Sequence, residues 1–188
     1  MPNNVLIDAM HDMIEPDFHI TPNETNTVRI LEPQAQASCH FVDIQFKKSM
    51  PYFAFSIDKP RQKNLGDPVY PFFNPDKACL CTKNDGILFV QQSDKLYIFL
   101  IELKSNNPGK YLQQLKAAKI FVDFIIQRIK LCNPGVNTPV DYRGILFSCR
   151  RTPAESLTKK GKVEYTNRGG LQVAEQGCHN HYFIQQFL

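Results

Sequence analysis

The sequence predicts an α/β fold in which a β-sheet is covered on both faces. The first observation is the segment 95–103, which is rich in β-branched and aromatic residues. Because side chains alternate along a strand, this one is apolar on both faces and must be buried on both sides. The second observation is the segment 108–132, whose apolar residues recur at helical spacing and suit packing on a sheet. The strand's two faces carry Leu96, Ile98 and Leu100 on one side and Tyr97, Phe99, Ile101 and Leu103 on the other.

Length and composition bound the protein class. The chain has 188 residues, of which 43% are hydrophobic and 21% charged, so we expect one globular domain over residues 1–188 rather than a disordered, collagenous or coiled-coil protein. The longest apolar run, 96–101, is far shorter than the roughly 20 residues of a membrane span, so no membrane partner is expected. The N-terminus does not look like a signal peptide. The six scattered cysteines favour reduced thiols and a cytoplasmic location.

The N-terminal part of the chain predicts a helix and two strands. Asn3 or Asn4 can cap a helix with one apolar face, and the patterns at 41–46 and 52–57 favour strands. The segment 47–77 is rich in proline and aromatic residues interleaved with cations, which indicates a loop-rich insertion. Its aromatic rings either pack on the body of the protein or stack on nucleic-acid bases.

A β-hairpin is predicted at 86–103. A two-residue turn at Ser93–Asp94 pairs Gln92 with Lys95 and, in the same register, places Asp85 opposite Glu102.

The helix that follows the hairpin has clear start and stop signals. We expect Asn107 as its N-cap and Pro108 as its first residue, with a stop at 133–135. A buried strand is predicted at 142–149, and a terminal element of undetermined type at 182–188.

The predicted register brings together residues suited to a metal ion. Directly opposed residues have Cβ atoms about 5 Å apart, so the carboxylates of Asp85 and Glu102 repel one another unless a cation lies between them. A hard divalent cation such as Mg²⁺ prefers such oxygen ligands. Lys104 lies on the same face as Glu102 and is placed to orient a water molecule. The competing interpretation is an exposed ion pair between Glu102 and Lys104 at a strand end.

These residues resemble a known family. The runs Asn84-Asp85-Gly86-Ile87-Leu88-Phe89 and Tyr97-Ile98-Phe99-Leu100-Ile101-Glu102-Leu103-Lys104, followed by a helix with Gln114-Leu115, resemble the core of the PD-(D/E)XK nuclease superfamily. The resemblance covers about residues 78–149. It implies the restriction-endonuclease-like fold, a three-layer sandwich with a central mixed β-sheet flanked by helices.

The resemblance also implies roles for individual residues. Asp85 and Glu102 would bind Mg²⁺ or Mn²⁺, with the carbonyl of Leu103 as a further ligand, and Lys104 would assist the attacking water. Gln114 matches a glutamine that several branches carry on this helix. Many members add an acid from an early helix. The candidates for that position are Glu15, Glu24 and Glu32, of which we select Glu24.

The function implied is a metal-dependent nuclease, either an endonuclease or an exonuclease, that hydrolyses phosphodiester bonds. The resemblance favours DNA as the substrate and is compatible with restriction, defence or repair, with a homodimer or a partner protein in a larger system. The alternative is a catalytically silent member of the fold that binds nucleic acid or a protein partner.

A basic segment at 150–168 is a candidate surface for a polyanion. It holds six basic residues against two acidic ones, an excess equal to the net charge of +4 of the whole chain. We expect phosphate contacts from Lys159, Lys160 and Lys162, or else from the helix residues Lys110 and Lys116. The alternative is a solvated loop.

A zinc site is a weaker candidate. Two cysteines and a later cysteine with two histidines could supply four ligands, but the first pair is separated by one residue instead of the usual two to four. The residues concerned are Cys79, Cys81, Cys178, His179 and His181.

Overall fold

The computed structural model describes residues 5–58, 69–77, 79–134, 138–150 and 161–188 and shows a mixed α/β fold. Within these residues, the larger sheet has the order β3 (Tyr52–Phe55), β4 (Gly86–Gln92), β5 (Lys95–Lys104), β6 (Val140–Ser148), β8 (Leu171–Gly177) and β7 (Thr166–Arg168). The smaller sheet has the order β1 (Thr27–Leu31), β2 (Phe41–Gln45) and β9 (His181–Phe183). The helices are α1 (Val5–Met13) and α2 (Tyr111–Cys132), with short 3-10 helices η1 (Pro16–Phe18) and η2 (Ile184–Gln186).

The larger sheet is mixed, as predicted. Its strands β3, β4 and β5 run antiparallel, and β5, β6 and β8 run parallel. The hairpin register is confirmed, because Gln92 pairs with Lys95 and Gly86 with Ile101. Ser93 in the turn takes a positive φ of 53°, which suits a tight two-residue connection.

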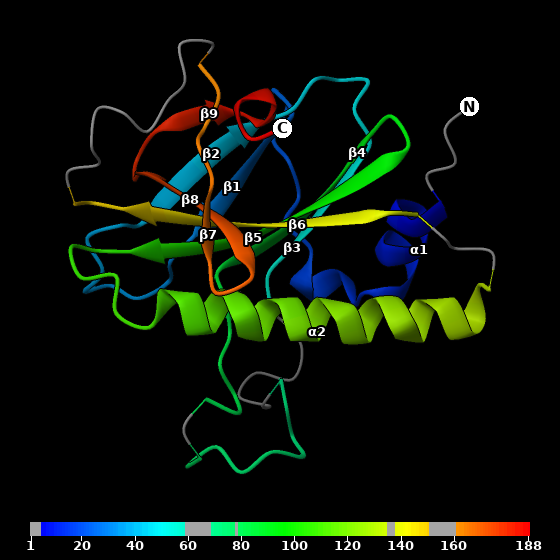
Figure 1. Cartoon of the computed structure of the whole chain (residues 1–188), viewed down its shortest axis with the longest axis horizontal. Coiled ribbons are helices and arrows are strands. Elements are labelled where there is room, and N and C mark those ends of the chain that lie inside the picture. Colours follow the sequence, from blue (N-terminus) through cyan, green and yellow to red (C-terminus); the bar gives the residue numbers. More distant parts are fainter. Residues whose placement is uncertain (1–4, 59–68, 78, 135–137, 151–160) are drawn as a thin grey trace.

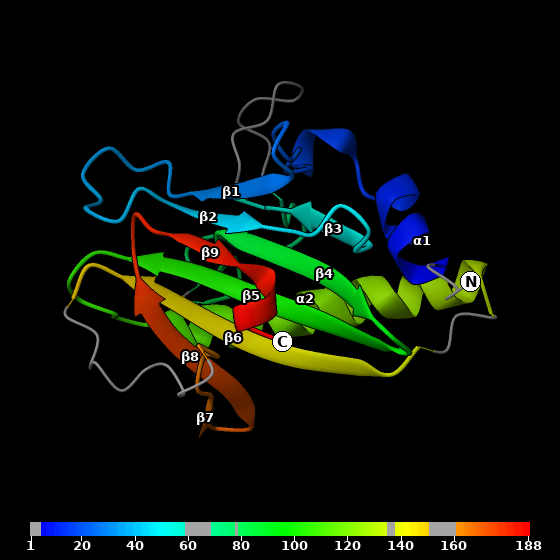
Figure 2. The same ribbon diagram turned by 90° about the horizontal axis from the view of Figure 1, so that it is seen from above.

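The larger sheet is covered on both faces, as the two apolar faces of β5 predict. Leu96, Ile98 and Leu100 join a core with α1 and α2. Phe99, Ile101 and Leu103 join a second core with β1, β2 and the C-terminal residues. Figure 1 shows α2 along one side of this sheet and the smaller sheet on the other, and Figure 2 shows the same layers from above. The expectation of helices on both faces is therefore wrong for the described residues, because the second layer there is a sheet.

Helix α2 starts later than its sequence signals predict. Asn107 does not act as the N-cap, because its Oδ1 accepts the N–H of Gly109 in a turn in which Gly109 has φ of 52°. The helix begins at Tyr111. Its end is as predicted, since the N–H of Asn133 closes the last turn on the Ile129 carbonyl. The predicted stripe of Tyr111, Leu115, Ala118, Val122, Ile125 and Ile129 is buried except at Tyr111, which is half-buried, and Ile126 is buried with it.

The proline-rich insertion packs partly on the protein body. Phe53 and Phe55 are buried on β3, and the Tyr70 ring lies 5.7 Å from that of Phe121. Phe72 remains 76% exposed. The cations at 59–63 lie outside the described residues, so their predicted role beside the aromatic rings is not addressed.

Two cysteines correct the expectation of reduced thiols. Cys39 and Cys178 form a disulfide with a Cα–Cα distance of 5.6 Å. Disulfides are uncommon in a reducing cytoplasm, so the cytoplasmic location remains a prediction. A search of the described helices for one with the length and apolarity of a membrane span finds none.

Candidate metal centre

The hairpin holds Asp85 against the end of β5. Asp85 immediately precedes Gly86, and Gly86 pairs with Ile101, so continuing this register by one residue places Asp85 at the level of Glu102. Its Oδ2 accepts the backbone N–H of Leu103 at 2.6 Å, which fixes the carboxylate beside β5. Gly86 is needed here for space, because an added Cβ would lie 2.8 Å from Ile30 Cδ1 on β1. The close approach of β1 in turn brings the residue after it, Glu32, to Asp85.

Glu102 is a fully buried carboxylate whose negative charge and hydrogen-bonding capacity are only partly satisfied by its neighbours. It is 0% exposed, and its Oε1 forms an ion pair with Lys104 Nζ at 2.5 Å. Among the described residues, neither oxygen has a hydrogen-bond partner of good geometry. Burial and, to a smaller extent, the negative charge of Asp85 raise the pKa of Glu102 to about 9 even though Lys104 opposes both effects.

The pKa of Asp85 is shifted in the same direction as that of Glu102. Burial, with a smaller contribution from the charge of Glu32, raises the pKa of Asp85 to about 7 although the hydrogen bond from Leu103 lowers it. Two buried carboxyl groups in one place must bind protons or be neutralised by a cation. A divalent cation is one group that would neutralise them, but the carboxylate oxygens that lie within 4.8 Å of one another among the described residues belong to Glu32, Asp58 and Asp85 and not to Glu102.

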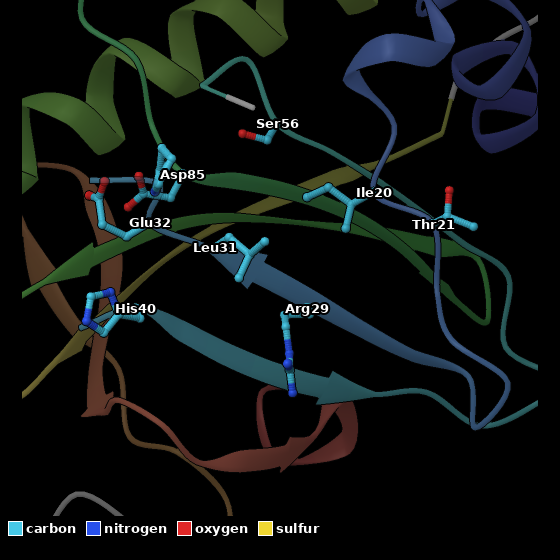
Figure 3. A pocket seen from close by; sticks show the side chains of 9 residues that line it. Ile20, Thr21, Arg29, Leu31, Glu32, His40, Ser56 and Asp85 are labelled. Carbon is cyan, nitrogen blue, oxygen red and sulfur yellow. The ribbon is translucent and has the colours of Figure 1, made fainter. Parts of the chain in front are cut away.

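A further acid comes from Glu32 rather than from Glu24. One carboxylate oxygen each from Glu32, Asp58 and Asp85 lie within 4.8 Å of one another. Figure 3 shows the carboxylates of Glu32 and Asp85 close together. Glu24 is exposed and precedes β1, whereas Glu32 follows it, so the two lie at opposite ends of the strand. Glu15 is exposed before η1, and we replace the choice of Glu24 with Glu32.

Neighbouring side chains support the acidic residues. Lys83 Nζ lies 2.9 Å from Asp58 Oδ1 and balances its charge, which leaves Glu32 as the better third ligand for a cation. Gln114 Nε2 donates to the Lys83 carbonyl at 3.4 Å, so the predicted glutamine of α2 contacts the segment that leads to Asp85. Leu103 is buried between Glu102 and Lys104, as its position in the strand requires.

A cleft of about 530 Å³ reaches the acidic residues. Glu32 and Asp85 are among its lining residues, so a bound ligand in the cleft would meet both carboxylates. The other lining residues are Ile20, Thr21, Arg29, Leu31, Pro33, His40 and Ser56 (Figure 3).

The sequence reasoning missed a charged group beside Lys104. Lys104 pairs with Ser148 in the β5–β6 register, and Ser148 Oγ donates to Glu175 Oε1 at 3.3 Å. Arg150 binds both carboxylate oxygens of Glu175. The sequence indicated only that Arg150 belongs to a basic segment. The position of Arg150 next to Glu175 depends on the β6–β8 register, which the sequence did not predict.

The predicted phosphate-binding lysines are only partly located. Lys110 and Lys116 are exposed on the N-terminal part of α2 or just before it, and Lys116 Nζ lies over Gly169. Lys162 Nζ is 3.5 Å from the Leu188 carbonyl. Lys159 and Lys160 lie outside the described residues.

The residues of the weaker zinc candidate do not lie together in the structure. Cys178 is bonded to Cys39, and the sulfur atom near this pair belongs to Cys149 rather than to Cys79 or Cys81. The proposed zinc set is therefore wrong for the oxidised protein.

The stability of the metal-free protein is expected to fall as the pH rises. Glu102 has a pKa of about 9 when folded, against an ordinary value of 4.5, so unfolding releases a proton throughout this window. The contribution of Glu102 to the free energy of unfolding is complete below pH 4.5 and is lost as the pH rises to 9. The corresponding contribution of Asp85 is lost as the pH rises to 7. Between its ordinary and its folded pKa, each such group shifts the unfolding equilibrium toward the unfolded state by up to about tenfold per pH unit.

Denaturant unfolding of the wild type and Glu102→Gln between pH 5 and pH 9 checks this prediction. The variant cannot ionise at position 102, so its stability is expected to depend less steeply on pH and to exceed that of the wild type at pH 8. Parallel curves for the two proteins would show that Glu102 is ionised in the folded state at neutral pH.

Comparison with known proteins identifies no relative. No family model, curated protein or solved structure matches the chain. The functional assignment therefore depends on the geometry around Asp85 and Glu102.

Proposed function

We propose that this protein is a metal-dependent nuclease that hydrolyses phosphodiester bonds. The observation that carries the proposal is the fully buried Glu102, which lies at the level of Asp85 and forms an ion pair with Lys104. A purely structural ion pair gains little from such burial, because the desolvation of two charges offsets their attraction. A site that must hold a cation has a reason to keep these carboxylates together.

The residues of the site have distinct roles in this proposal. Asp85, Glu102 and Glu32 would hold Mg²⁺ or Mn²⁺, with the Leu103 carbonyl as a further ligand. When bound, the cation would stabilise the negative charge that develops on the phosphate. Lys104 would donate a hydrogen bond that orients the attacking water. Gln114 would keep the segment before Asp85 in place through its contact with Lys83.

A variant of the restriction-endonuclease-like fold, in which a small sheet takes the place of one helical layer, and a DNA substrate belong to the same proposal. They are supported by a mixed sheet in which an antiparallel hairpin carries Asp85, Glu102 and Lys104 and leads through α2 to the parallel strand β6. The exposed Lys110 and Lys116 would contact phosphates near the site. Restriction, defence or repair, and assembly as a homodimer or with a partner protein, remain compatible with this chemistry.

Incubation with single- and double-stranded DNA and RNA tests the proposed function. We expect cleavage with Mg²⁺ or Mn²⁺ and none after a chelator removes the metal. Binding of nucleic acid or protein without cleavage of any of the four substrates would instead favour the catalytically silent member of the fold.

A further inference from the structure

Three sulfur atoms meet at the end of the larger sheet, next to β5. The Cys39–Cys178 disulfide lies there, and the sulfur of Cys149 is within 4.8 Å of both of its sulfur atoms. The N–H of Cys149 points to the carbonyls of Lys104 and Ser105, at 3.3 and 3.1 Å. The cluster is thus adjacent to the candidate metal centre but separate from its acidic residues.

The sheet register makes Cys149 a suitable second partner for Cys178. Ser148 pairs with Gly177 in the parallel β6–β8 ladder, and Cys149 and Cys178 are the next residues on each strand. The ladder continues to this point, because the N–H of Cys178 donates to the Ser148 carbonyl at 3.1 Å. Neighbouring strands lie about 4.8 Å apart, which is within the Cα–Cα range that a disulfide spans.

The three cysteines differ in exposure and therefore in reactivity. Cys39 is fully buried, whereas Cys149 and Cys178 are partly exposed. Cys178 is consequently the sulfur of the disulfide that an attacking thiolate can reach. Burial raises the pKa of Cys149, so this residue is a thiol at neutral pH and becomes a nucleophile as the pH rises.

We propose that Cys149 is the internal exchange partner of the Cys39–Cys178 disulfide. Cys149 loses its proton to solvent, and its thiolate attacks the sulfur of Cys178. A Cys149–Cys178 bond forms while the Cys39–Cys178 bond breaks, and the electron pair leaves on Cys39, which takes up a proton. The numbers of disulfides, thiols and protons are unchanged, so no oxidant or reductant is consumed.

The exchange changes how the segment 33–40 is attached. In the structure, this segment is held covalently through Cys39 and by hydrogen bonds that include those from the N–H of Ser38 to Ser105 Oγ at 2.7 Å, from the N–H of His40 to His179 Nε2 at 3.0 Å and from the N–H of Glu32 to the His40 carbonyl at 2.9 Å. The segment follows Glu32 directly, and His40 lines the same cleft. A bond between Cys149 and Cys178 removes the covalent attachment and leaves only noncovalent contacts near Glu32.

Peptide mapping of Cys39→Ser tests the proposed bond. The variant is treated with oxidised glutathione, a small-molecule disulfide, then quenched with acid and alkylated before digestion. We expect a Cys149–Cys178 disulfide as the main product. In the matched variant Cys39→Ser/Cys149→Ser, Cys178 is expected to remain a mixed disulfide with glutathione, and the exposed Cys132 is not expected to pair in either variant. A persistent glutathione adduct on Cys178 while Cys149 is present would overturn the proposal.

A measurement on the wild type does not depend on the folding of these variants. The protein is held at pH 7 or pH 9 without added thiol, quenched and mapped. We expect alkylated Cys39 and the Cys149–Cys178 peptide to appear faster at pH 9. In samples from both incubations labelled at a common pH of 7, amide hydrogen exchange within 33–40 is expected to increase with the yield of these products while that of α2 stays unchanged. Alkylated Cys39 that never appears at either pH, with Cys39–Cys178 as the sole bond found, would contradict the exchange.

Discussion

Replacement of either Glu102 or Lys104 by alanine is expected to lower the rate of phosphodiester cleavage by about 10²-fold or more. Glu102→Ala removes a carboxylate that would hold the cation, and Lys104→Ala removes the ammonium group that would orient the water. Rates at saturating nucleic acid and Mg²⁺ measure the effect, because they separate the loss of chemistry from weaker substrate binding.

Lys95→Ala is the matched control for Lys104→Ala. Lys95 also forms an ion pair, with Asp141 at 2.7 Å, but it lies at the opposite end of β5. We expect this variant to cleave at the wild-type rate. Wild-type rates in folded Glu102→Ala and Lys104→Ala proteins, judged by their circular dichroism and melting curves, would exclude this site as the catalytic centre.

Divalent cations are expected to raise the melting temperature of the wild type, and Glu32→Gln is expected to lose most of this gain. Metal bound only by the folded state stabilises it by about 2.7 kcal/mol when its concentration is 100 times the dissociation constant. The carboxylate of Glu32 lies within 4.8 Å of those of Asp58 and Asp85, so its loss removes both a ligand and negative charge. Thermal melts over a millimolar series of Mg²⁺ and Mn²⁺ measure the effect.

Glu24→Gln makes the same chemical change at the other end of β1, where the side chain is exposed. It is expected to keep the full response to metal. An equal response in Glu24→Gln and Glu32→Gln would show that Glu32 is not a ligand, and a wild type whose melting temperature ignores both metals would argue against the centre as a whole.

The position of Asp85 opposite Glu102 could be predicted because it depends on the residue pattern of a single hairpin. A two-residue turn and two apolar strands determine the β4–β5 register, so Asp85 and Glu102 could be placed together without knowledge of distant residues. The same holds for the apolar stripe of α2 and for the position of its last turn. These features depend on periodicity over one hairpin or one helix, which a single sequence records well.

The features that the sequence did not predict depend on contacts between distant segments. Strand β1 has only five residues and was not predicted, so nothing in the sequence favoured Glu32 for the third acid and Glu24 was selected instead. Strand β8 contains two glutamines and a glutamate, which are not typical strand formers, and its parallel pairing with β6 brings Glu175 to Ser148. The start of α2 was missed because Asn107 caps a turn instead of the helix.

Anomalous scattering from crystals grown with Mn²⁺ tests the metal centre most directly. The position of the ion is read without reference to activity, and its ligands are identified one by one. We expect a peak bound by carboxylate oxygens of Asp85 and Glu102 at about 2.2 Å, with Glu32 directed to the same ion. Crystals that contain saturating Mn²⁺ but show no peak between Asp85 and Glu102 would contradict the account.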